Sequence, residues 1–420
     1  MPIRALPVRP NLDQLKHQAK DLLREIRAGE AAATAELREF HPAPPAAAAA
    51  KLADAQLTLA RSYEASSWPR LTQAVQLVDA LWEDDLAAVR KLITANPHLL
   101  HEQVLIRSNS NWGPPMTYAA NLGRDAIINY LHAAGASDLK SAAARAALQG
   151  HVGTARRLYD KAGRPALDDG ALGGPAYTLS ADGTALLLAL GAPLRAGRGC
   201  PAEVVLQTDS RDPGAKHAIL EMYAQHGLAL PDTAPMALHR GRLDLLEAHL
   251  RRDPQLLTRT FSHREIYPAE LGCADPIDAT VGTPLGGSTL LHMCVDYDEM
   301  EIAIWLLDRG MSPNVTSAIG ASGFGGHTPL FNTVVSQPNF WMNYRKRGPF
   351  TAPFAELLLA RGAEPNVRAS LWKRLHPGHG DTTRHEYRDV TALSWGRRFH
   401  DPVFVSEPAM RLIGAAAGVE

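Results

Sequence analysis

Apolar residues recur every three or four positions over most of the chain, and this spacing predicts short amphipathic helices. Near the amino terminus the recurrence runs over 12–26. Asn11 is placed to cap that helix at its start, and Gly29 is placed to end it. Two further helices are expected over 52–63 and 68–81. The first 80 residues therefore form a helical segment of their own.

Beyond residue 80 one arrangement repeats: a short apolar helix, a glycine just past its end, and a second helix with apolar residues at helical spacing. Three clear copies begin at Ala119, Ala146 and Ala237. In most copies the second helix ends at another glycine, namely Gly135, Gly163, Gly191, Gly227, Gly310 and Gly362. The first three intervals between these glycines are 28, 28 and 36 residues. Such a period holds two short helices and a turn.

Several of these copies resemble the ankyrin repeat. The opening of that repeat, close to Thr-Pro-Leu-His, is similar to Thr289-Leu290-Leu291-His292 and to Thr328-Pro329-Leu330-Phe331. The end of the repeat is similar to the segments 306–314 and 357–367, where Arg-Gly is followed shortly by Pro-Asn. The resemblance covers roughly residues 80–420.

The resemblance implies an all-α fold, an ankyrin-type α-solenoid of helix pairs with hairpin loops. One helix pair cannot bury its apolar face alone, so neighbouring pairs supply the missing surface. Residues 1–80 resemble the helical leader that precedes ankyrin arrays in some bacterial proteins. We therefore expect a helical N-terminal cap over 1–80, which covers the first repeat, and a repeat array over 81–420.

Long insertions interrupt the carboxy-terminal copies, near 262–287, 316–326, 338–352 and 370–389. Loops of this length inside a compact fold are usually functional or disordered, and aromatic residues within loops are usually packed. Corresponding loops of a solenoid project from the same edge. We therefore expect the insertions to fold together over the concave face and to turn an open groove into a pocket.

The composition is that of a folded chain without a strong net charge. Its 420 residues are 45% hydrophobic, and 43 Lys and Arg nearly balance 44 Asp and Glu. This balance disfavours a dedicated nucleic-acid binder. No apolar run approaches the ~18 residues of a membrane span, so no membrane association and a cytoplasmic location are expected. The three cysteines, Cys200, Cys273 and Cys294, form no pattern typical of a disulfide scaffold or a zinc module.

The leading hypothesis for function is a non-enzymatic interaction protein that holds a partner protein or a small polar ligand on its concave, loop-fringed face. A few aromatic and arginine side chains would supply most of the affinity. The candidate binding residues are Tyr297, Trp341, Tyr344, Arg345 and Trp372. Basic residues also gather over 368–398, which indicates either a solvated polar end of the array or a site for an anionic ligand or an acidic peptide.

The alternative hypothesis is an enzyme, an acid/base hydrolase or lyase acting on a small polar substrate such as a glycoside. Its pocket would be built by the inserted loops. The candidate catalytic residues are Asp275, Asp278, Asp296 and His327, because carboxylates and imidazoles transfer protons. His292 stands at the histidine of the ankyrin-like opening, where the resemblance implies a structural bond to the backbone.

Three histidines of the fourth insertion, His376, His379 and His385, provide imidazoles for a divalent metal such as zinc or iron. Their spacing matches no established metal motif, so solvated side chains are the competing interpretation. No other cofactor is expected.

Overall fold

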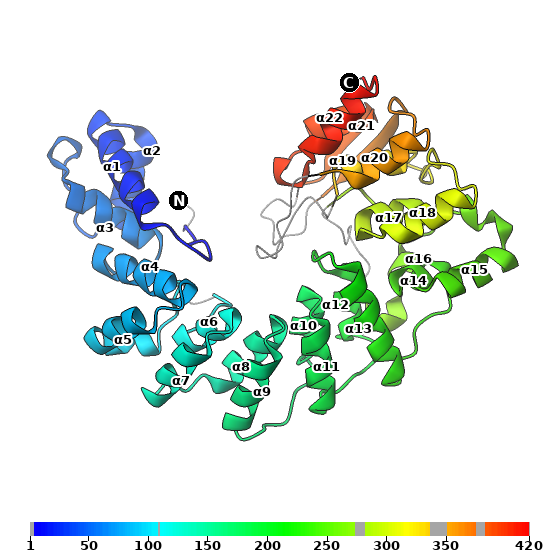
Figure 1. Ribbon diagram of the computed structural model, residues 1–420. Coiled ribbons are helices and arrows are strands. Elements are labelled where there is room, and N and C mark those ends of the chain that lie inside the picture. Colours follow the sequence, from blue (N-terminus) through cyan, green and yellow to red (C-terminus); the bar gives the residue numbers. More distant parts are fainter. Residues whose placement is uncertain (1–3, 108–109, 274–281, 337–350, 375–382, 420) are drawn as a thin grey trace. The chain divides into compact units, whose positions relative to one another are not determined.

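A computed structural model of the chain describes residues 4–107, 110–273, 282–336, 351–374 and 383–419. The structure is mostly helical, which confirms the all-α expectation in its coarse form. It divides into two compact units, Met1–Ala166 and Leu167–Glu420 (Figure 1). None of the described helices combines the length and the apolar character that a membrane span requires.

The described part of the first unit contains nine α-helices. They are α1 (Leu12–Ala28), α2 (Ala31–Phe40), α3 (Leu52–Ser62), α4 (Trp68–Trp82), α5 (Leu86–Ala95), α6 (Pro115–Leu122), α7 (Asp125–Ala133), α8 (Leu139–Leu148) and α9 (Val152–Lys161). The last six form successive pairs: α4 with α5, α6 with α7, and α8 with α9. The first helix of each pair contacts the first helix of the next, so the pairs are stacked.

The amino-terminal helices pack on the first of these pairs. The side chain of Asn11 accepts a hydrogen bond from the backbone N–H of Gln14, and α1 ends at Gly29 with φ 75°, both as predicted. α1 and α3 contact α4. Tyr118 on α6 donates its hydroxyl proton to the carbonyl oxygen of Val8, and the indole N–H of Trp82 donates to the Tyr118 oxygen at 3.0 Å. The chain ahead of α1 is thereby bonded to the second helix pair.

The described part of the second unit contains thirteen α-helices and two strands. They are α10 (Gly173–Thr178), α11 (Ala181–Ala189), α12 (Pro201–Gln207), α13 (Pro213–Gln225), α14 (Ala234–His239), α15 (Leu243–Arg252), α16 (His263–Ile266), α17 (Leu290–Tyr297), α18 (Met300–Asp308), α19 (Pro329–Val334), α20 (Pro353–Ala360), β1 (Ala369–Lys373), β2 (His385–Val390), α21 (Ala392–Arg398) and α22 (Glu407–Ala415). Helix pairs follow one another here too, and α14, α17, α19 and α21 contact each other in that order.

The glycines that the sequence marks as helix ends have the backbone conformation that this role requires. All six have positive φ, from 80° at Gly163 to 106° at Gly135. An L-residue with a side chain is strained in this conformation, which explains why glycine recurs. Another left-handed position lies between the two helices of a pair, and there Asp298, with φ 61°, joins α17 to α18 in place of the glycine found between α6 and α7.

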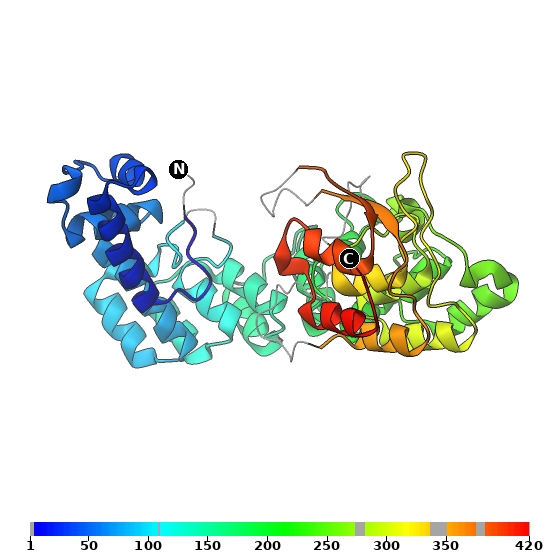
Figure 2. The ribbon, with the colours of Figure 1, turned by 90° about the horizontal axis from the view of Figure 1, so that it is seen from above.

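The fourth predicted insertion contains an antiparallel hairpin of β1 and β2, which the all-α expectation omits. Leu371 lies opposite Tyr387, and Trp372 lies opposite Glu386. Leu371 and Tyr387 are buried, and the Tyr387 ring packs edge-on against Trp395 of α21 at 4.7 Å between ring centroids. Because side chains alternate along a strand, Trp372 and Glu386 lie on the other face of the hairpin. Figure 2 shows this hairpin (orange) and the 316–327 loop (yellow) rising on the same side of the second unit's helices.

Candidate functional site

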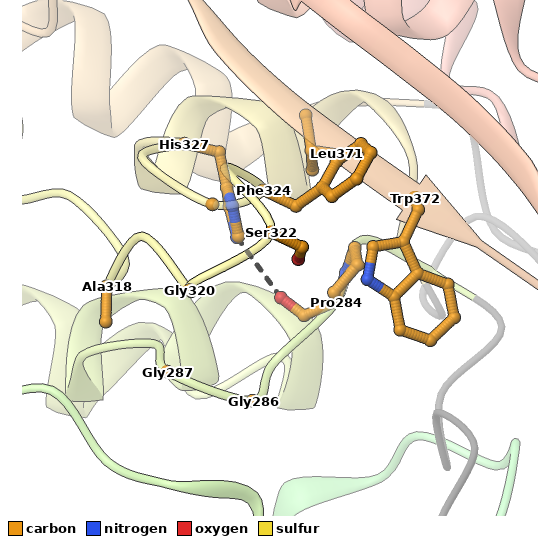
Figure 3. Close-up of a pocket in the computed structure, with 11 residues that line it drawn as sticks. Pro284, Gly286, Gly287, Ala318, Gly320, Ser322, Phe324, His327, Leu371 and Trp372 are labelled. Carbon is orange, nitrogen blue, oxygen red and sulfur yellow. Dashed lines mark hydrogen bonds between the residues drawn. The ribbon is translucent and has the colours of Figure 1, made fainter.

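Described residues of three predicted insertions line one pocket of about 240 Å³ in the second unit (Figure 3). The lining residues are Pro284, Gly286, Gly287, Ala318, Gly320, Ser322, Phe324, Gly325, His327, Leu371 and Trp372. They belong to the turn ahead of α17, the loop ahead of α19, and β1, which lies ahead of α21. Three successive helix pairs therefore each contribute one wall.

The loop over 316–327 is itself a hairpin. The Ser317 N–H donates to the His327 carbonyl oxygen at 2.9 Å, and the Gly320 N–H donates to the Phe324 carbonyl oxygen at 2.8 Å. The Gly325 N–H then donates to the carbonyl oxygen of Ser370 at 2.7 Å, which ties the loop to β1. This backbone bond fixes the distance between two walls of the pocket.

Gly325 is required for that arrangement. Its φ is 122°, and a Cβ atom placed on it would lie 2.0 Å from the carbonyl oxygen of Ala318. A contact this short with backbone forces the hairpin to move. The neighbouring Gly323 also has positive φ, 77°, but a Cβ atom there would have no atom within 4 Å.

We therefore expect Gly325→Ala to disrupt the pocket much more than Gly323→Ala does. The Gly323 variant should cost about 1–2 kcal/mol of folding stability, the ordinary penalty of left-handed backbone for an L-residue. The Gly325 variant adds the clash with Ala318 and should make 316–327 sensitive to limited proteolysis. Equal proteolysis rates for the two variants would contradict the assigned role of Gly325.

The mouth of the pocket carries aromatic rings with arginine side chains above them. The Arg384 guanidinium lies 4.6 Å from the ring centroid of Trp372, and the Arg388 guanidinium lies 4.4 Å from that of Phe324. The carboxylate of Glu386 lies 3.0 Å from both guanidinium groups. Two cations against one anion leave this face of the hairpin with net positive charge.

His327 is a buried ring with both nitrogens engaged. Its Nε2–H donates to the carbonyl oxygen of Pro284 at 3.1 Å, the dashed line of Figure 3, and its Nδ1 pairs with the Ser317 hydroxyl at 2.8 Å. Burial, together with the neighbouring His292, holds the pKa of His327 well below its ordinary value. The neutral ring therefore connects two walls of the pocket. Because both of its nitrogens are hydrogen-bonded, neither is available as a general base.

His292 forms the backbone bond that the ankyrin-like opening implies. Its Nδ1 lies 2.9 Å from the Thr289 hydroxyl, and its Nε2–H donates to the carbonyl oxygen of His327 at 2.9 Å. Burial lowers the pKa of His292 to about 4. The ring therefore links the start of α17 to the segment that leads into α19.

Asp296, a candidate catalytic residue, does not line the pocket. Its Oδ2 accepts a hydrogen bond from Arg211 Nη2 at 2.9 Å, and its carbonyl oxygen accepts one from Arg211 Nε at 2.7 Å. Both side chains are buried, with 0% of Asp296 and 7% of Arg211 exposed. This ion pair joins the turn between α12 and α13 to the end of α17.

Tyr297, a candidate binding residue, is only 2% exposed, so its ring has no surface to offer a partner. Its hydroxyl donates to the carbonyl oxygen of Leu206 at 2.9 Å and lies 2.6 Å from the Tyr267 hydroxyl. Burial raises the pKa of Tyr297 well above its ordinary value. In this structure the residue belongs to the core.

A second buried ion pair lies beside the first. Lys216 Nζ is 2.7 Å from Glu299 Oε1, and the His217 ring nitrogen Nε2 is 2.8 Å from the same oxygen. Burial lowers the pKa of Lys216. Although burial alone raises the pKa of Glu299, the charges of Lys216 and His217 bring it below its ordinary value. α13 is thereby bonded to the start of α18.

Of the other predicted site residues, Trp372 lines the pocket and His385 stacks on His400, with 3.8 Å between ring centroids. The remaining ones lie outside the described residues: Asp275, Asp278, Trp341, Tyr344, Arg345, His376 and His379. Within the described ranges, no three His, Cys, Asp or Glu side chains are grouped so that they could hold a metal ion. The proposed three-histidine metal site stays a prediction.

The sequence interpretation did not single out Phe324 or Ile319. Both are apolar residues inside the glycine-rich 316–326 segment, which was predicted as a wall of the pocket without any binding residue of its own. The available signal was a large apolar side chain among glycines. Such a side chain in a loop is usually packed or contacts a ligand, and this would have marked both residues as candidates.

Together these features define a mostly helical protein of successive helix pairs, with an apolar pocket between the loops of three of them. Comparison with known proteins gives no family for it: no family model matches the chain, and no curated protein shows significant similarity to it.

Proposed function

We propose that the chain is an ankyrin-type repeat protein that binds a segment of a partner protein in the pocket beside β1. The stacked helix pairs, the glycines after their second helices and the bond from His292 to the next pair support the ankyrin assignment. Binding, rather than catalysis, is the function that the pocket's side chains favour, because its imidazole is fully engaged and its other large side chains are apolar.

The observation that carries the proposal is an exposed apolar side chain beside the pocket. Ile319 is 69% exposed, and its two chain neighbours, Ala318 and Gly320, line the pocket. A single apolar residue on a surface needs no explanation, but one beside an apolar pocket adds to the apolar area there. A small ligand would fill the pocket without reaching Ile319, whereas a peptide segment would cover both.

The experiment is a selection of random twelve-residue peptides displayed on phage against the full-length protein. Affinities of the selected peptides are then measured by fluorescence anisotropy. We expect Trp372→Ala to weaken binding by roughly 30-fold, the effect of removing a central aromatic anchor. The matched control is Trp305→Ala on α18, another tryptophan of this unit with an arginine above its ring, Arg309 at 4.0 Å.

The control should change the affinity less than two-fold. A selection that enriches no peptide would contradict the proposal. So would peptides that bind Trp372→Ala as tightly as they bind the unchanged protein.

A further inference from the structure

We infer that the segment bound in this pocket is acidic, with an apolar side chain in the pocket and carboxylates paired to Arg384 and Arg388. The inference rests on the proposed function, because it specifies the chemistry of the same partner. It assigns a binding role to two arginines of the basic 368–398 segment, for which the sequence left open a solvated polar end or a site for an anionic ligand or an acidic peptide.

The pairing of the hairpin places these arginines at the pocket mouth. Glu386 lies directly opposite Trp372, so both side chains share one face of the hairpin. Arg384 and Arg388 lie two positions on either side of Glu386 and therefore share that face too. Arg384 lies above Trp372, which itself lines the pocket.

Stacking also orients the two guanidinium groups. Each lies within 5.5 Å of an aromatic ring centroid, and Arg384 is near both Trp372 and Phe324, at 4.6 and 5.4 Å. A stacked guanidinium keeps the N–H groups at its edge free to donate. Such a group binds carboxylates through two parallel hydrogen bonds, and the fixed orientation reduces the entropy lost on binding.

The existing partner of these arginines is easily exchanged. Glu386 pairs with both, but the side chains of Arg384, Glu386 and Arg388 are 48%, 39% and 61% exposed. Exposed ion pairs of this kind contribute little, so a ligand carboxylate competes with water and one weak partner. The unbalanced positive charge favours an anion in that competition.

The surrounding sequence strengthens the preference for an anion. Residues 368–398 include seven Lys and Arg but three Asp and Glu, in a chain whose net charge is only −1. A local positive field of this kind accelerates the encounter with an oppositely charged partner. Because Arg384 and Arg388 lie beside an apolar pocket, an acidic peptide with an apolar anchor fits this site better than a nucleic acid.

The test uses the peptides selected on the full-length protein. Their sequences are expected to combine a large apolar residue with neighbouring Asp or Glu. One such peptide is then compared with a version in which every Asp and Glu is replaced by Asn and Gln. At 50 mM salt the acidic version should bind at least ten-fold more tightly, and the ratio should shrink at 500 mM salt because screening weakens the attraction.

In the double variant Arg384→Gln/Arg388→Gln the ratio of the two affinities should fall to one, so that the acidic and the neutral peptide bind equally. Arg309→Gln is the matched control, because Arg309 also lies above a tryptophan ring and pairs with a carboxylate. Arg309 follows α18 directly, and its partner Glu247 lies on α15. This control should leave the ratio unchanged. Circular dichroism of both variants checks that the fold is retained.

Peptides that bind through Trp372 without any preference for acidic residues would overturn this inference and leave the proposed function in place. An acidic preference that persists in the double variant would also overturn it. Displacement of the peptide by single-stranded DNA of equal charge would show that the site recognises charge alone and would equally contradict it. Failure to enrich any peptide would contradict both proposals.

Discussion

Replacing Asp296 with alanine is expected to destabilise the second unit by about 3–5 kcal/mol. The guanidinium of Arg211 would then remain buried without its carboxylate. Arg211 is held in place by further bonds to the carbonyl oxygens of Thr208 and Ser210, so it cannot simply turn toward solvent. Urea denaturation followed by tryptophan fluorescence measures the change.

The matched control is Asp308→Ala, which removes the partner of Arg361 in an exposed ion pair of 2.8 Å. Exposed pairs contribute about 0–1 kcal/mol, so the control should be nearly neutral. A second check is the double variant Arg211→Met/Asp296→Leu. It removes both charges and should be more stable than Asp296→Ala alone. Equal small losses for Asp296→Ala and the control would contradict the structural role of this pair.

Lowering the pH from 7 to 5 is expected to destabilise the second unit strongly. His239, His292 and His327 are buried, and burial holds the pKa of each ring below its ordinary value of 6.5. The unfolded chain therefore takes up protons first as the pH falls below 6.5, which favours unfolding. At pH 5 the loss is about 2 kcal/mol for a ring such as His292, whose pKa is about 4, and above pH 6.5 it disappears.

Urea midpoints measured between pH 7.5 and 5 test this expectation. His327→Gln should reduce the slope of stability against pH by roughly one third, because one of three rings no longer takes up a proton on unfolding. That reduction is independent of any cost of the substitution at pH 7. His226→Gln, at an exposed position after α13, should leave the slope unchanged. If His327→Gln also leaves the slope unchanged, the buried rings do not control the acid response.

The helical architecture was predictable because its signals are local. Asn11 and Gly29 bound the first helix as expected, and the six glycines after second helices all have positive φ. Each of these features depends on a few neighbouring residues, so the sequence alone contains the information.

The β1–β2 hairpin was not predictable in the same way. Leu371 and Trp372 lie in an insertion where nothing in the local pattern shows which face will be covered. Trp395 and Phe399, which come later in the chain, pack against Tyr387 and cover that face of the hairpin, and Trp372 lines the pocket from the other face.

The candidate site shows the same distinction between features set by local sequence and features set by distant residues. Trp372 was identified from its residue type and its place in an insertion. Asp296 and Tyr297, which lie in no insertion, were identified from residue type, yet Arg211, more than 80 residues earlier in the chain, takes up the carboxylate. A partner this distant in sequence leaves no local signal, so residue type alone cannot separate a reactive carboxylate from a structural one.

Hydrogen–deuterium exchange of the full-length protein with a selected acidic peptide tests the central claim most directly. The claim is that loops of three successive helix pairs together form one binding pocket. Exchange is predicted to slow in 284–288, 316–327 and 369–373 and to remain unchanged in the first unit. Slowed exchange in the first unit, with none in these three segments, would contradict the account.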